Sequence, residues 1–174
     1  GEFDITISSP DGTDVSHLRR EWLFRERLFL AIGNDPVLES LKELRRCDRI
    51  PFDELAKHEI IVTGRQDSLG YLLHQYEQRT GVKLNQRPAF GQLMTTLRYV
   101  ADGYGALLSP SSAFFHLELT GQVHALEVEQ PEIWRDVFIS TSSERPQTAL
   151  IRAVIPLIRK VVRQEYDAGH WKGE

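Results

Sequence analysis

The chain has 174 residues, of which 41% are hydrophobic, 26% charged and 9% aromatic, and its formal net charge is −4. This length allows one domain or two small ones, and it is enough to bury a core. The single cysteine excludes an internal disulfide, the acidic balance argues against a nucleic-acid-binding surface, and no apolar run approaches the roughly 20 residues that span a bilayer. The first residues lack the basic and apolar regions of a signal peptide. We therefore expect a soluble, cytoplasmic protein.

The first third of the chain predicts two strands. Apolar and polar residues alternate over 3–7 and then stop at a turn cluster, 8–12. Residues 22–32 form a long, mostly apolar and extended run. The basic residues from Arg19 to Arg27 are interleaved with glutamates, which favours a solvated face over a DNA-binding stripe.

The central part predicts two strand–helix units. Residues 60–62 are a compact β-branched run, typical of a buried parallel strand, and a helix closed by Gly81 follows. A second unit has a strand at 88–90 and a helix that opens at Gly91 and Gln92. We expect that helix to turn four residues inward: Leu93, Leu97, Val100 and Ala101.

The last part predicts strands at 106–108, 123–128 and 137–139, and a helix that begins near Pro146. Pro156 lies inside this helix and predicts a kink or the loss of one hydrogen bond. We expect its buried face to carry Leu150, Val154, Leu157 and Val161. The alternation of strands and helices predicts an α/β domain with a mainly parallel sheet.

The order of these segments resembles the effector-binding domain of LysR-type transcriptional regulators. Residues 100–110, VADGYGALLSP, resemble the family's Val-Ala-x-Gly-x-Gly-Ile-x-x-Leu-Pro signature, which is the most specific match. Residues 1–7 resemble its Gly-x-Leu-Asp-Leu-Ala-Ile strand, and 52–55 its short Asp-Leu helix. Residues 28–38 resemble its crossover strand and His-Pro-Leu turn, with Asp35 in place of the histidine.

The resemblance implies two Rossmann-like lobes of the type 2 periplasmic-binding-protein fold. Residues 1–32 and 127–174 would form an incomplete first lobe, residues 33–126 would form the second, and the family's DNA-binding winged helix-turn-helix would be absent from this chain. It implies a regulatory domain that binds a small-molecule effector and changes subunit packing. It also implies a homodimer or tetramer, contact with DNA only through the missing domain, and neither a cofactor nor a membrane partner.

The effector is expected between the lobes, because ligands of open parallel sheets bind outside the carboxyl ends of the strands. Backbone amides and helix N-termini at that edge favour an anionic group. Thr63 and Gln92 would donate hydrogen bonds and Arg65 a bidentate charge. Thr63 as a simple helix cap and Arg65 in solvent are the plainer alternatives. The complete set of expected effector-binding residues is Ser8, Ser9, Thr63, Gly64, Arg65, Gly91, Gln92, Ser109 and Pro110.

Other functions find less support in the residues. A solute-binding protein of a transporter with the same bilobal fold is the main alternative. An enzyme on a related scaffold is a third possibility, but no catalytic set is visible and the six histidines show no metal-binding spacing. Cys47 stands among arginines, which could lower its pKa and make it a redox sensor, although the chain holds no resolving cysteine.

Overall fold

The computed structural model describes residues 3–62 and 67–174. Within these residues the chain forms eight strands, six α-helices and one short 3₁₀ helix. In chain order these are β1 (Ile5–Ser8), β2 (Leu18–Gly33), α1 (Glu39–Lys42), η1 (Leu44–Arg46), β3 (Arg49–Pro51), α2 (Phe52–Leu55), β4 (Ile60–Val62), α3 (Ser68–Thr80), β5 (Gln86–Pro88), α4 (Leu93–Ala101), β6 (Ala106–Pro110), α5 (Ser111–Leu119), β7 (Val123–Glu129), β8 (Trp134–Ser142) and α6 (Ala149–Asp167).

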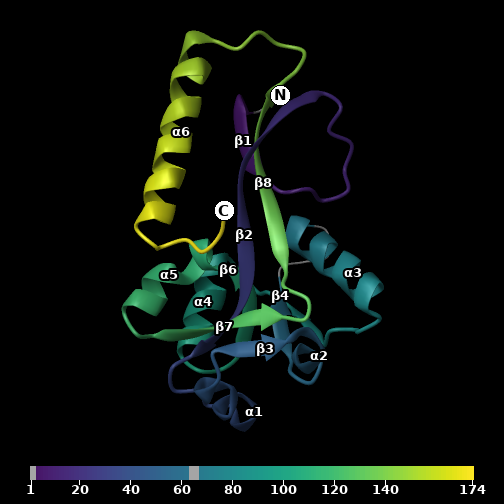
Figure 1. Ribbon diagram of the computed structural model, residues 1–174, viewed down its shortest axis with the longest axis vertical. Coiled ribbons are helices and arrows are strands. Elements are labelled where there is room, and N and C mark those ends of the chain that lie inside the picture. The colour runs from purple at the N-terminus through teal and green to yellow at the C-terminus, as the bar shows by residue number, and fades with distance from the viewer. Residues whose placement is uncertain (1–2, 63–66) are drawn as a thin grey trace.

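The 16-residue strand β2 runs along the length of the molecule and belongs to both its upper and its lower half (Figure 1). Its residues 18–27 pair with β8, and its residues 28–33 lie between β6 and β7. We call residues 3–27 and 134–174 the upper half, and the described residues between 28 and 133 the lower half. All pairings of β2 are antiparallel, so the sheet is mixed, and the expectation of a mainly parallel sheet is wrong.

The lower half has helices on both faces of its sheet. Strands β5, β4 and β6 are parallel, as expected for the strand–helix units, although β5 spans residues 86–88 and not 88–90. Leu28, Leu30 and Ile32 of β2 pack on one side with α2 and α3, whereas Phe29 and Ala31 pack on the other side with α4 and α5. The apolar run in the sequence therefore reflects a strand that is buried on both faces.

The upper half has one helix on one face of its sheet. Helix α6 packs on β2 and β8 through a core formed by Leu23, Phe24, Val137, Ile139 and Val162. Strand β1 pairs with β8 alone and forms the end of the sheet. No helix among the described residues combines the length and the apolar character needed to cross a membrane.

The predicted buried face of α6 is wrong. Leu150, Leu157 and Val161 are exposed, and the neighbouring stripe Ile151, Ile155, Ile158 and Val162 faces the core. Pro156 lies inside the continuous helix. In α4, Leu97 and Val100 are buried as expected, but Leu93 is exposed.

Candidate functional site

A cavity of about 230 Å³ lies where the two halves approach each other beside α3. We call it the inter-half cavity. Ser9 and Pro10 come from the loop after β1, and residues 134–136 come from β8. Helix α3 contributes the rest of the lining: Ser68, Tyr71, Leu72 and Gln75. The cavity is therefore built from both halves, so the space available in it depends on their relative position.

The loop after β1 brings the upper half onto α3. A second, adjacent cavity of about 320 Å³ is lined by Ser8, Ser9, most of the loop up to Val15, and Tyr71. Gly12 adopts φ +83°, and a Cβ there would lie 2.9 Å from a ring carbon of Tyr71. A glycine is needed for this close approach, which fixes the loop against the helix.

The start of α3 is set by Asp67. Its carboxylate accepts hydrogen bonds from the backbone N–H groups of Leu69 (3.0 Å) and Gly70 (2.9 Å). This is the usual arrangement of an N-cap, so Asp67 performs the capping role that the sequence left open for Thr63. Thr63, Gly64 and Arg65 themselves lie outside the described residues.

A buried carboxylate contacts Arg135, which lines the cavity. Glu26 of β2 is 1% exposed and accepts hydrogen bonds from Nε of Arg135 (2.8 Å) and from the Ser112 hydroxyl (2.7 Å). Arg135 also forms an ion pair with it. Burial, and secondarily the negative charge of Glu26, raise the pKa of Tyr166 well above its usual value. Glu26 of β2 thus connects β8, through Arg135, with α5, through Ser112.

Asp136, which lines the cavity next to Arg135, also has partners. Oδ1 of Asp136 accepts a hydrogen bond from the Trp22 indole at 3.1 Å and lies 3.8 Å from Nε of Arg25. Because Arg135 and Asp136 both have partners, the described groups that remain for a ligand are chiefly hydroxyls and an amide: Ser9, Ser68, Tyr71 and Gln75.

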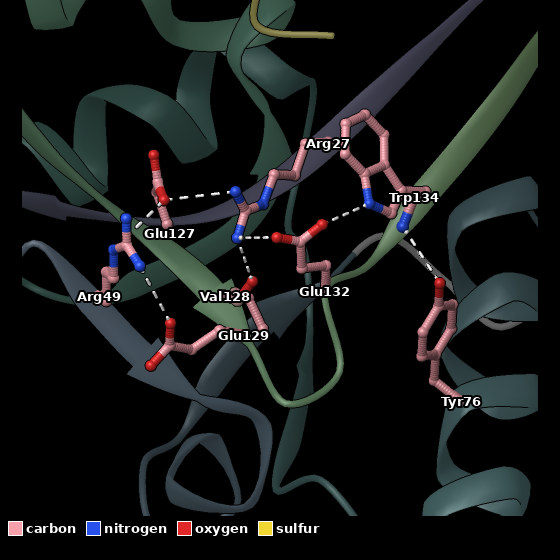
Figure 2. A network of polar contacts seen from close by, with 8 residues as sticks. All are labelled: Arg27, Arg49, Tyr76, Glu127, Val128, Glu129, Glu132 and Trp134. Carbon is pink, nitrogen blue, oxygen red and sulfur yellow. Dashed lines mark hydrogen bonds and ion pairs between the residues drawn. The ribbon is translucent and has the colours of Figure 1, made fainter. Parts of the chain in front are cut away.

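An ion-pair network surrounds the point where β2 passes from one half to the other (Figure 2). The Arg27 guanidinium contacts carboxylate oxygens of Glu127 (3.3 Å) and Glu132 (3.1 Å) and donates to the backbone carbonyl of Val128 (2.9 Å). Arg49 reaches the same Glu127 at 3.6 Å. Arg27 therefore joins β2, β7 and the connection to β8 in one place.

This network extends to the helix that lines the cavity (Figure 2). The Trp134 indole donates to Glu132 at 2.8 Å, and the Trp134 backbone N–H donates to the Tyr76 hydroxyl of α3 at 3.2 Å. The Arg25 guanidinium lies 5.3 Å from the centre of the Trp134 ring. Helix α3 is thus tied to the start of β8, where the chain returns to the upper half.

The prediction of a solvated charged face from Arg19 to Arg27 is wrong at its end. Glu26 is buried and the Arg27 side chain is only 15% exposed, because the strand enters the interior there. The sequence signal was present: both charges directly precede the continuous apolar run that begins at Leu28. A charge next to such a run has to be paired.

The expected effector-binding residues that the structure describes fall into three groups. Ser8 and Ser9 lie beside α3, and Ser9 lines the inter-half cavity. Gly91 (φ +65°) and the N-cap Gln92 are exposed at the start of α4, whereas Ser109 and Pro110 are buried at the end of β6. Of the described residues in the expected set, only Ser9 lines the inter-half cavity beside α3.

Other reactive side chains do not assemble into a site in the described part of the chain. Its histidines, cysteine and carboxylates form no group of three that could hold a metal. Cys47 is exposed, with its sulfur 3.8 Å from the Glu43 carbonyl oxygen, and a His124 ring nitrogen lies 2.6 Å from the Cys47 carbonyl oxygen.

Solved structures share this architecture at low sequence identity. The Synechocystis PCC6803 CcmR regulatory domain in complex with 2-PG is 14% identical, with a TM-score of 0.73 over 92% of this chain and 74% of that one. The effector binding domain of QuiR in complex with shikimate gives 14% and 0.73, over 94% and 73%. The reduced OxyR regulatory domain from Pseudomonas aeruginosa gives 18% and 0.64, over 91% and 73%. These likenesses establish the fold.

A search of curated proteins found no match. The family comparison is decisive, because the LysR substrate binding domain matches residues 1–163, nearly the whole chain. The resemblance drawn from the sequence signature at residues 100–110 is thereby confirmed. The chain belongs to the LysR substrate binding domain family.

Proposed function

We propose that this chain is the effector-sensing domain of a DNA-binding transcriptional regulator, and that a small anionic metabolite binds in the inter-half cavity. One observation carries the proposal: the cavity is lined by Ser9 from the upper half and by Ser68 and Tyr71 from the lower half. A ligand held from both sides has different affinities for different arrangements of the halves. It therefore shifts the population of those arrangements.

The residues between β4 and α3 supply the anion-binding groups in this proposal. Thr63 and Arg65 precede the N-cap Asp67 and the cavity residue Ser68 by only a few positions. Arg65 binds the anion as a bidentate partner, since Arg135 is already engaged by Glu26. Gly91 and Gln92 follow β5, and Ser109 and Pro110 end β6. Both strands flank β4 in the same sheet and are parallel to it, so we assign these residues to the same edge.

The halves correspond to the two lobes that the resemblance implied. We propose that the boundary between them lies at the Arg27 network, and we call this point the joint, since residues 28–32 and 127–133, which the resemblance assigned to the first lobe, pack in the lower half. The domain works in the cytoplasm as a homodimer or tetramer, it is not an enzyme, and a separate helix-turn-helix domain contacts DNA. The exposed apolar residues of α6 support association. Sedimentation showing only monomer at high concentration would contradict the oligomer.

Isothermal titration calorimetry tests the ligand class. The probes are sodium shikimate, citrate and inorganic phosphate, with glycerol as the neutral compound. We expect at least one anion to bind and Arg65→Met to weaken it about tenfold or more. Arg98→Met, on an exposed arginine of α4 that pairs with the C-cap Asp102, is the matched control and should leave binding unchanged. Binding of glycerol alone, or equal affinity in Arg65→Met, would overturn the anionic assignment.

A further inference from the structure

The residues that follow α6 turn back and form an antiparallel β-bridge with β2, between Gly173 and Glu26. Gly169, with φ +73°, reverses the chain after the helix. The backbone N–H of Arg25 donates to the Glu174 carbonyl and the Glu174 N–H donates to the Arg25 carbonyl, both at 2.8 Å. The Arg27 N–H donates to the Lys172 carbonyl at 3.2 Å. Residues 172–174 therefore occupy an edge of β2 at the joint between the halves.

The upper half holds this segment through aromatic packing and a close backbone approach. The Trp171 ring lies 5.7 Å from Phe24 and 5.9 Å from Tyr166, between centroids. A Cβ at Gly173 would overlap the Arg25 carbonyl oxygen and lie 2.8 Å from the Tyr166 hydroxyl oxygen. Only a glycine fits at this position, so the pairing with β2 depends on Gly173.

The lower half holds the same segment through α5 and the inner end of β2. The Lys172 backbone N–H donates to the buried Ser111 hydroxyl at 2.7 Å, and Lys172 Nζ lies 2.9 Å from a carboxylate oxygen of Glu118. The same Nζ lies 5.0 Å from the centre of the Phe29 ring. Two residues before Lys172, the His170 ring stacks on Phe115 of α5, with 5.1 Å between ring centroids.

We infer that residues 168–174 form a strap that fixes the angle between the two halves. The adjacent residues Trp171 and Lys172 contact different halves: Trp171 packs in the upper half, and Lys172 contacts α5 in the lower half. A rotation at the joint therefore has to break one of these two sets of contacts. Neighbouring Glu26, which accepts from Ser112 of α5, adds a further contact across the same boundary. The strap rests on the proposed function only in using the same two halves as moving parts. It stabilises one arrangement before any effector is present.

Pulsed electron paramagnetic resonance on the full 174-residue chain tests the strap without any effector. Spin labels are placed at Ala153→Cys on α6 and Lys83→Cys after α3, in a Cys47→Ser background. The test variants are Lys172→Met, which keeps the aliphatic stem, and Gly173→Val, which blocks the strand pairing. Lys160→Met, on the exposed side of α6, is the matched control.

We expect a narrow distance distribution for the parent chain and the control, and a shifted or broadened one for both strap variants. Hydrogen exchange at the Arg25 and Arg27 amides should accelerate about fivefold in Lys172→Met, as loss of one hydrogen-bonded anchor implies. If Gly173→Val does not fold, Lys172→Met and Ser111→Ala decide the question. Unchanged distances and exchange in these variants overturn the strap. Failure of every anion to bind would overturn the proposed function and leave the strap result standing.

Discussion

The two halves of the molecule use the same strand in different ways. In the lower half, residues 28–32 of β2 are buried on both faces between two layers of helices. In the upper half, residues 18–27 of the same strand pack on α6 on one side only, and Trp22 is 49% exposed. The lower half therefore has three layers. Among the described residues, the sheet of the upper half carries a helix on one face only, and β1 is its edge strand. Stability should follow this division.

The largest expected effect contrasts a leucine from each half. Leu30→Ala removes a fully buried side chain from the lower core and should lower the free energy of unfolding by about 2–5 kcal/mol. Leu157→Ala acts on a side chain that is 59% exposed on α6 and should cost less than about 0.5 kcal/mol. Urea unfolding measures both. Similar losses for the two variants would show that the outer face of α6 is covered in solution.

The next effect concerns the joint between the halves. Arg27→Met leaves the carboxylates of Glu127 and Glu132 without their shared partner and should cost about 2 kcal/mol. Arg49→Met removes an arginine that is 65% exposed and contacts the same Glu127, and it should cost less than about 1 kcal/mol. Thermal unfolding compares them. Equal destabilisation would mean that the joint is no more than an ordinary surface ion pair.

A smaller effect is expected where α3 meets β8. Tyr76→Phe removes the hydroxyl that accepts the Trp134 backbone N–H, and it should cost about 1 kcal/mol. Tyr104→Phe, at a tyrosine that is 47% exposed, is the matched control and should be neutral. Trp134 fluorescence should change in the first variant only. An unaltered spectrum and unfolding midpoint in Tyr76→Phe would remove α3 from the network at the joint.

The smallest expected effect is a pH dependence in the lower half. Partial burial lowers the pKa of His58 below its ordinary value of 6.5. Between the lowered pKa and 6.5, the unfolded chain binds more protons than the folded one, so stability should fall as the pH drops below about 6.5. His58→Gln should reduce this pH dependence of the free energy of unfolding. An unchanged slope in urea unfolding at pH 5 to 7.5 would contradict the assignment.

Local sequence patterns predicted most of the lower half. The β-branched run at 60–62 and the helix closed by Gly81 are confirmed, because burial on both faces and a left-handed glycine each leave a local signature. Helix α5 was missed, since its apolar residues surround the helix and give no stripe. In α6 two apolar stripes lie next to each other, and only packing against β2 and β8 selects the one with Ile151 and Val162.

Fewer residues of the candidate site could be predicted from the sequence. Ser9, which lines the cavity, was predicted because it lies at the end of a strand, where ligands bind in this class of fold. Tyr71 and Trp134 were not, because their meeting depends on how the loop after β1 settles on α3 and on the register between β2 and β8. Neither relation has a local signal in the chain.

The pairing of β2 with β8 also limits how the halves can move. Bending the two paired strands out of the plane of the sheet leaves their hydrogen bonds in place. Sliding one strand along the other is different, since a shift by one residue turns every side chain to the wrong face and a shift by two breaks the whole ladder from Leu18 to Arg27. We therefore expect the two halves to move by bending of the β2–β8 ribbon, and not by sliding of one strand along the other.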